Sequence, residues 1–231
     1  CPCLVIMNRY VASFLFFFLV SPTFVEAATF YVDKDDGACS NAGACTVSTA
    51  PCCSIQGAVD KTQAAGDSIL VRNAVTAYDE RVLINADNGT AGSCTATATS
   101  TCITLKPDTG HNPTLRNCGD TGEGMIEIQN VDYWNIQGFS LNGSGCTGGG
   151  LTSQWGIAIW SQASAANGNI IQGNTITSWC GPDETNGTST GDQLRCYPIF
   201  VRNLDTVNYP SDNIIQDNVI DNAKNQAINV R

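Results

Sequence analysis

The chain has 231 residues, with 11 lysines and arginines against 21 aspartates and glutamates, and a formal net charge of −10. This balance argues against nucleic acid as a partner, because no basic cluster is available to release phosphate counterions. It also argues against a strongly polyanionic substrate unless calcium or a local basic patch lies at the site.

The first 27 residues are predicted to be a leader and not part of the fold. Residues 1–6 precede Met7 and are interpreted as an upstream extension. Asn8 and Arg9 then precede the apolar run VASFLFFFLV at 11–20, and small residues end the segment at Ala27, an order typical of a secretory signal. A membrane anchor is the weaker alternative, because a span needs about 20 apolar residues. We therefore expect a secreted protein, extracellular, periplasmic or on the cell surface, whose mature chain at 28–231 is one domain without a membrane span.

Ten cysteines follow the predicted leader, and an even number in this setting indicates disulfides. Zinc is the competing interpretation, but His111 is the single histidine and the mature chain contains no CxxC pair. Local spacing favours the bridges Cys94–Cys102 and Cys180–Cys196. The pairing of the other six stays open: Cys39, Cys45, Cys52, Cys53, Cys118 and Cys146.

The first predicted elements are a helix and three strands. Apolar or small residues recur at helical spacing in SIQGAVDKTQAA (54–65), and Gly66-Asp67 is expected to end the helix. Strands are predicted at SILVR (68–72), ERVLI (80–84) and CITLKP (102–107).

An octet then recurs three times, as WNIQGFSL (134–141), NIIQGNTI (169–176) and NIIQDNVI (213–220). Between the copies lies an alternating apolar segment, at 125–130, 156–161, 198–203 and 227–231. Units this short cannot bury an apolar face alone, so we expect them to stack as parallel coils of three strands, a right-handed β-helix. Asn174 and Asn218 would then form a ladder at a bend. An antiparallel sandwich is the alternative.

TFYVDKDDG (29–37) and SIQGAVDKTQAAGDSILVRNAVTAYDERVLI (54–84) resemble the N-terminal cap and first coil of right-handed β-helix proteins of the pectate-lyase-like superfamily. The chain departs from that pattern at 73–76, where the family usually has a Gly-Thr-Tyr turn. The resemblance implies an all-β, right-handed parallel β-helix over 28–231 with a short N-terminal capping α-helix. Because residues 226–231 start a strand, we expect the chain to be the N-terminal part of a longer protein.

The predicted site lies on the outward columns of the alternating segments. One column holds Glu127, Ala158, Phe200 and Asn229; the next holds Gln129, Trp160, Arg202 and Arg231, with Arg72 below them. An indole can stack on a sugar ring, and a guanidinium can bind a uronate carboxylate with two hydrogen bonds. We therefore predict a polysaccharide-binding groove in a monomer. The alternative is a solvated face that binds no ligand and has one aromatic residue covered by a loop. The predicted substrate-binding residues are Trp160, Glu127, Gln129, Phe200 and Arg231.

Lyases of the superfamily abstract the proton α to the uronate carboxylate, and they need a basic residue and a charge that neutralises the carboxylate. On this resemblance Arg202 is the candidate catalytic base. Asp183, Glu184 and Asp192 are candidate Ca²⁺ ligands, although a solvated loop is the commoner role of such acids. A glycoside hydrolase of the same fold would need clustered aspartates, for which Asp217 and Asp221 are the nearest candidates. A non-catalytic, adhesin-like scaffold is the rival from another class.

Overall fold

The computed structural model describes most of the chain after the predicted leader. It covers residues 26–62, 64–86, 94–95, 97, 100–116, 124–143, 155–178, 197–204, 206–221, 223 and 226–231.

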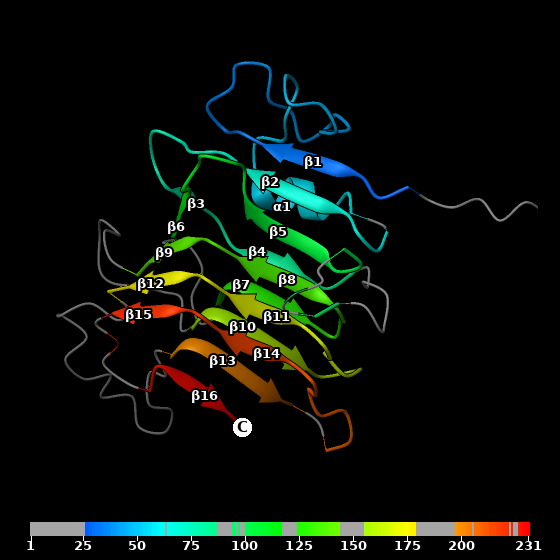
Figure 1. Ribbon diagram of the computed structural model, residues 1–231, viewed down its shortest axis with the longest axis vertical. Coiled ribbons are helices and arrows are strands. Elements are labelled where there is room, and N and C mark those ends of the chain that lie inside the picture. Colours follow the sequence, from blue (N-terminus) through cyan, green and yellow to red (C-terminus); the bar gives the residue numbers. More distant parts are fainter. Residues whose placement is uncertain are drawn as a thin grey trace, which may run out of the picture.

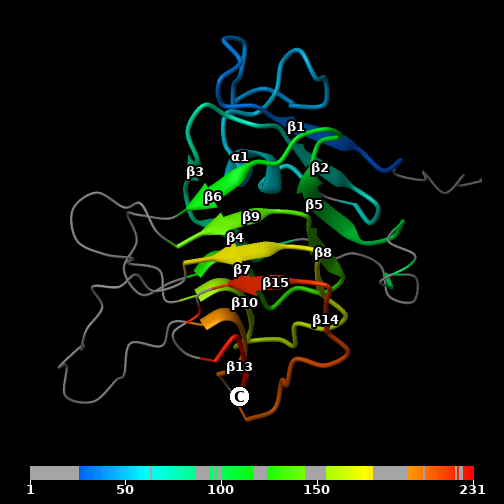
Figure 2. The same ribbon diagram turned by 60° about the vertical axis from the view of Figure 1, so that its left-hand side comes forward.

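The strands form three parallel sheets (Figures 1 and 2). Sheet A contains β1 (Thr29–Val32), β2 (Ser68–Val71), β5 (Ile103–Pro107), β8 (Trp134–Gln137), β11 (Ile170–Gln172) and β14 (Ile214–Gln216). Sheet B contains β3 (Tyr78–Asp79), β6 (Thr114–Arg116), β9 (Ser140–Asn142), β12 (Thr175–Thr177) and β15 (Val219–Asp221). Sheet C contains β4 (Val82–Ile84), β7 (Gly124–Gln129), β10 (Trp155–Ser161), β13 (Tyr197–Asn203) and β16 (Ile228–Val230).

From β2 onward the chain contributes one strand to sheet A, one to sheet B and one to sheet C, and then repeats the order. Figure 2 shows β6, β9, β12 and β15 stacked one below another. Each described pairing between strands is parallel, so the antiparallel sandwich is wrong. The fold is all-β, and its three sheets are compatible with a parallel β-helix.

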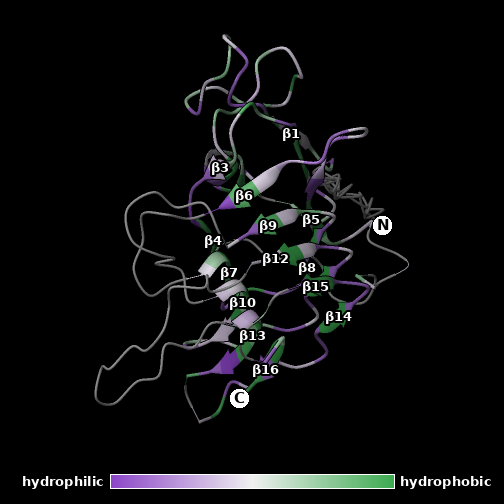
Figure 3. Cartoon of the chain, turned by 90° about the vertical axis from the view of Figure 1, so that its left-hand side faces the viewer, coloured by the Kyte–Doolittle hydropathy of each residue, from purple (hydrophilic) through white to green (hydrophobic). Residues whose placement is uncertain are grey.

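The octet repeat sets the register of sheets A and B, as the sequence predicts. Ile171 pairs with Ile136 on one side and Ile215 on the other, while Ile176 pairs with Leu141 and Ile220. Ile136, Ile171, Leu141 and Ile176 are fully buried, so these columns form the core. Figure 3 shows hydrophobic and hydrophilic segments sharing the same strands, as expected when one face of each strand turns inward.

Asparagine side chains join successive coils at the bend between sheets A and B. Asn174 Oδ1 accepts a hydrogen bond from the backbone N of Phe139 at 3.0 Å, and Asn174 Nδ2 donates to the carbonyl of Ile136 at 3.1 Å. Asn218 makes the equivalent contacts one coil further on, including 3.0 Å to Asn174 Nδ2. The predicted ladder is therefore confirmed.

A second ladder, which the sequence analysis missed, precedes sheet A. Asn169 Oδ1 accepts from the backbone N of Trp134 at 2.9 Å, and Asn213 Oδ1 accepts from the backbone N of Asn169 at 2.8 Å. Asn169 and Asn213 are the first residues of two octet copies. The repeated octet thus begins with one ladder and bends at the other.

The predicted capping helix is not supported as a cap. Helix α1 (Ile55–Val59) has five residues in place of the range 54–65, although Ile55, Ala58 and Val59 are buried as expected. Ser54 begins it by accepting from Gly57 N at 3.0 Å, and a helix this short covers little of a three-sheet core. The outermost strand at that end is β1, which pairs with β2 (Figure 1).

Three disulfides are present among the described residues. Cys94–Cys102 is confirmed, and Cys39–Cys53 and Cys45–Cys52 account for four of the cysteines whose pairing was open. Several disulfides in one chain are typical of an oxidising compartment. The predicted bridge between Cys180 and Cys196 lies outside the described residues.

In the described part of the chain, no helix is long and apolar enough to cross a bilayer. The predicted leader lies outside the described residues except for Glu26 and Ala27.

Glu80 provides a test of the packing around α1. Its Oε1 and Oε2 accept hydrogen bonds from the backbone N of Ile55 at 2.9 Å and of Gln56 at 3.0 Å. Burial raises the pKa of Glu80 above its ordinary value, and the two backbone donors offset only part of the rise.

Because the pKa of Glu80 is higher in the folded state than in the unfolded state, the protonated carboxyl group contributes to stability. This contribution is fully present below the pKa of the unfolded state and is lost as the pH rises through the pKa of the folded state. Urea unfolding measures the free energy of unfolding of wild type and of Glu80→Gln at about one pH unit below and about two pH units above the ordinary pKa of 4.5. We expect wild type to be the more stable protein by a margin that shrinks as the pH rises. An advantage that grows with pH would contradict the raised pKa.

Candidate functional site

The predicted outward columns lie in register on sheet C. Ala158 pairs with Glu127 on β7 and with Phe200 on β13, and Phe200 pairs with Asn229 on β16. Trp160 pairs with Gln129 and with Arg202. The hydrogen bond from Asn203 N to the carbonyl of Arg231, 3.1 Å, places Arg231 beside the end of β13.

Arg72 does not belong to this column. It follows β2 in sheet A, and its Nε lies 3.1 Å from Asp108 Oδ2. The period of two along a strand assigns the inward or outward direction of a residue but does not say which of three sheets a strand joins.

Aromatic rings cover the outer side of sheet C. The rings of Trp155 and Phe200 are stacked with their centroids 5.2 Å apart, and those of Tyr197 and Phe200 are stacked with their centroids 5.4 Å apart. Trp160 lies edge-on to Trp155 at 4.7 Å. Trp155, Tyr197 and Phe200 are buried and Trp160 is partly buried. The predicted contact of Phe200 with a ligand is untested, and in this structure Trp160 presents the more accessible ring.

Two arginines flank these rings. The guanidinium of Arg202 lies 6.0 Å from the ring centre of Trp160, and that of Arg231 lies 5.8 Å from the ring centre of Tyr197. Arg231 Nη2 also donates to the Tyr197 hydroxyl at 3.2 Å. Within the described residues neither arginine forms an ion pair with a carboxylate. We call Trp155, Trp160, Tyr197, Phe200, Arg202 and Arg231 the aromatic–arginine face.

Glu127 lies under this face and is only 1% exposed. Its Oε2 is 3.0 Å from Arg81 Nη2 and accepts from Gln129 Nε2 at 2.9 Å, while its Oε1 accepts from the backbone N of Gly124. The carboxylate is therefore fully engaged in protein contacts. Its predicted role in substrate binding remains a prediction, and the structure brings it together with Gln129 as expected.

The indole nitrogens of Trp155 and Trp160 are buried and have no hydrogen-bond partner in the described structure. A buried N–H group without a partner costs about 1–3 kcal/mol, so such groups are unusual in folded proteins.

The predicted calcium ligands Asp183, Glu184 and Asp192 lie outside the described residues. In the part of the chain that the structure does describe, no group of three histidine, cysteine or acidic side chains is arranged to hold a metal ion. Asp217 has a positive φ of 54° and lies at the bend before β15, so its backbone forms a turn. Asp221 ends β15.

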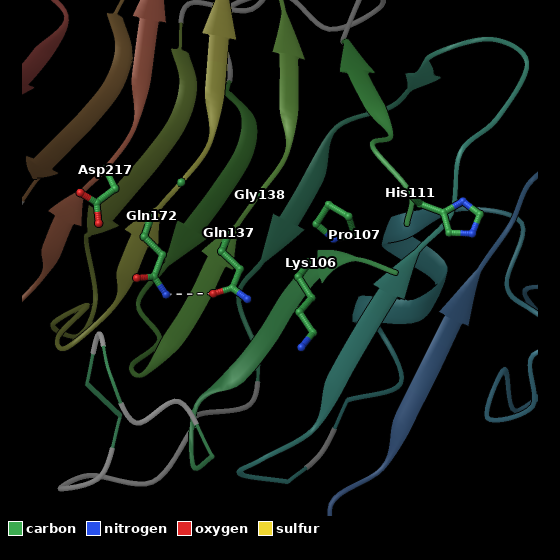
Figure 4. Close-up of a pocket in the computed structure, with 8 residues that line it drawn as sticks. Lys106, Pro107, His111, Gln137, Gly138, Gln172 and Asp217 are labelled. Atoms are coloured by element: carbon green, nitrogen blue, oxygen red, sulfur yellow. Dashed lines mark hydrogen bonds between the residues drawn. The ribbon is translucent and has the colours of Figure 1, made fainter. Parts of the chain in front are cut away.

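A pocket on sheet A was missed by the sequence analysis (Figure 4). It has a volume of about 540 Å³ and lies along the ends of β5, β8 and β11. The sequence did contain a signal, because the repeat aligns Gln137, Gln172 and Gln216 in one outward column. Its lining residues are Lys106, Pro107, His111, Gln137, Gly138, Gln172, Gly173 and Asp217, and we call it the glutamine pocket.

Comparison with known proteins adds no family to these observations. The chain matches no protein-family model, and no curated protein is significantly similar to it.

Proposed function

We propose that this chain is a secreted, right-handed parallel β-helix of the pectate-lyase-like kind that binds an acidic extracellular polysaccharide on its aromatic–arginine face. The observation that carries the proposal is the pair Trp160 and Arg202, one partly buried ring beside one guanidinium on adjacent strands. A sugar ring can stack on the indole while its carboxylate pairs with the guanidinium.

The local charge supports an acidic ligand although the whole chain is negative. Arg81 balances Glu127 within the sheet, which leaves Arg202 and Arg231 as charges without a described carboxylate partner. Two guanidinium groups at neighbouring positions match the repeated carboxylates of a uronate polymer. The local patch thus offsets the objection that the net charge of −10 raises.

The sharper form of the proposal is cleavage by β-elimination. Arg202, in its neutral form, would take the proton α to the uronate carboxylate, and the electron pair left behind would form the double bond between the α- and β-carbons as the bond from the β-carbon to the leaving sugar oxygen breaks. That oxygen would take a proton from water, and the hydroxide so formed would take back the proton held by Arg202. The products are a new reducing end and a chain with an unsaturated uronate. Calcium held by Asp183, Glu184 and Asp192 would neutralise the carboxylate, and this part of the proposal rests on the sequence alone.

The test is calorimetric titration of the protein with hexagalacturonate. We expect wild type to bind, and we expect Arg202→Ala and Trp160→Ala each to weaken binding by about 10- to 100-fold, because each removes a charged or stacking contact. Arg116→Ala is the matched control. It removes an equal charge from β6 on sheet B, where Arg116 Nε is paired with Asp79 at 3.3 Å, and should leave binding unchanged.

Ultraviolet absorbance of unsaturated uronates, followed on pectate, alginate and a glycosaminoglycan, distinguishes cleavage by β-elimination from binding alone. A rise that is lost with chelator and with Arg202→Ala supports the metal-dependent lyase. Binding with a flat absorbance trace supports recognition without β-elimination and leaves hydrolysis to be measured by reducing ends. Equal binding by Arg202→Ala and wild type would remove the proposed site, and no binding by wild type would favour the structural scaffold.

A further inference from the structure

The glutamine pocket contains a row of amide side chains that crosses neighbouring coils. Gln172 Nε2 donates to Gln137 Oε1 at 2.9 Å and to Asn135 Oδ1 at 3.2 Å, and Gln216 Nε2 donates to Gln172 Oε1 at 3.0 Å. Figure 4 shows Lys106, Gln137, Gln172 and Asp217 following one another across the strands. The amides are thus held in a fixed order about one strand spacing apart, roughly 4.8 Å.

Several polar groups in the pocket remain available to a ligand. Among the described residues, neither the Lys106 ammonium nor Gln137 Nε2 makes a hydrogen bond, and the Asp217 carboxylate has no ion pair. His111 Nδ1 accepts from the backbone N of Asn73 at 3.0 Å, which assigns the ring proton to Nε2. The pocket therefore presents donors at Lys106 and Gln137 and an acceptor at Asp217, while the His111 ring points away from these side chains in Figure 4.

Two glycines in the pocket lining leave space that a side chain would occupy. Gly138 and Gly173 have positive φ values of 78° and 62°, and a Cβ at Gly138 would come within 3.2 Å of Pro107 Cδ. A Cβ at Gly173 would meet no other atom within 4 Å, so a side chain there would stand in the open space of the pocket.

We infer that the glutamine pocket is a second binding site, for a neutral, hydroxyl-rich oligosaccharide. Lys106 and Asp217 carry opposite charges, so the lining has no net charge to select an anion or a cation. Hydroxyl groups both donate and accept, as the amides do, and amides repeated at strand spacing suit a chain of similar units. The volume of about 540 Å³ is within the range of sites that hold small ligands.

This site is separate from the aromatic–arginine face, because it lies on sheet A and shares none of its residues. The inference therefore does not depend on the proposed function.

The test is calorimetric titration of the same protein with neutral hexasaccharides: cellohexaose, xylohexaose, mannohexaose and a β-galactan hexasaccharide. We expect at least one to bind, and the double variant Gln137→Ala/Gln172→Ala to weaken that binding by about tenfold or more. Gln216→Ala is the matched control. It removes the same side chain from the same ladder outside the pocket lining, and should change the affinity by less than about twofold.

Two further variants keep the inference falsifiable if the double variant unfolds. Gln137→Glu keeps the size of the side chain but removes its donors and should also weaken binding. Arg202→Ala should leave neutral binding unchanged, which separates this site from the proposed function. The inference is overturned if no neutral hexasaccharide binds, if the folded double variant or Gln137→Glu binds as wild type does, or if the pocket binds only hexagalacturonate.

Discussion

Asn174→Ala is expected to destabilise the protein by about 2–4 kcal/mol, because Asn174 is fully buried and joins three coils. Its loss leaves the backbone N of Phe139 and the carbonyl of Ile136 without their partners, and it breaks the bond to Asn218. A buried backbone group without a partner loses its full hydration with no replacement.

Urea unfolding measures this loss, with Asn218→Ala as the matched control. Asn218 makes the same kind of contacts but is only partly buried, so water can replace some of them and the expected loss is about 1 kcal/mol. Equal midpoints for Asn174→Ala and wild type would show that the ladder does not stabilise the stack of coils.

Arg81→Met is expected to destabilise the protein by about 3 kcal/mol, because it leaves the buried Glu127 carboxylate without its counter-charge. Gln129 and the backbone N of Gly124 still donate to Glu127 in the variant. These neutral donors only partly compensate a carboxylate that is 1% exposed.

A double-mutant cycle with Glu127→Gln isolates the ion pair. In the Glu127→Gln background no buried charge remains, so Arg81→Met should cost less, with a coupling energy of about 1–2 kcal/mol. Additive effects of the two substitutions would mean that Arg81 stabilises the protein through its packing and other contacts and not through the charge of Glu127.

The octet repeat made the register of the coils predictable, because a recurring Ile-x-Gly/Asp bend can align only when equivalent positions stack. Ile136, Ile171 and Ile215 pair as the sequence predicts, and so do Trp160 and Arg202. These features depend on local periodicity, which one sequence contains in full.

On β10 and β13 the residues that alternation turns inward, Ile157, Ile159, Ile199 and Val201, lie in the main core cluster, and Ala158 and Phe200 lie in a separate cluster. On β16 the burial differs from the expectation, because Ile228 and Val230 are exposed and Asn229 is buried.

The burial of the aromatic–arginine face could not be predicted. Alternation places Phe200 on the outer side of sheet C, but Phe200 is fully buried because Trp155 and Tyr197 stack against it. Arg72 likewise follows a strand of sheet A and not of sheet C, and helix α1 is shorter than its predicted range. These features depend on how neighbouring coils pack, and periodicity carries no information on that contact.

The glutamine pocket could be predicted from the sequence only in part. Gln137 and Gln172 are aligned by the repeat, yet Lys106 and His111 come from a segment without the repeat. The depth of a pocket depends on how far adjoining bends stand out, which is set by the geometry at Gly138 and Gly173.

The most direct test of the account is backbone hydrogen exchange of the full chain with and without hexagalacturonate. The proposed function predicts slower exchange in β10 and β13, around Trp160 and Arg202, with no change in β8 and β11 of sheet A. Protection confined to sheet A, or no protection at saturating ligand, would contradict a polysaccharide site on the aromatic–arginine face.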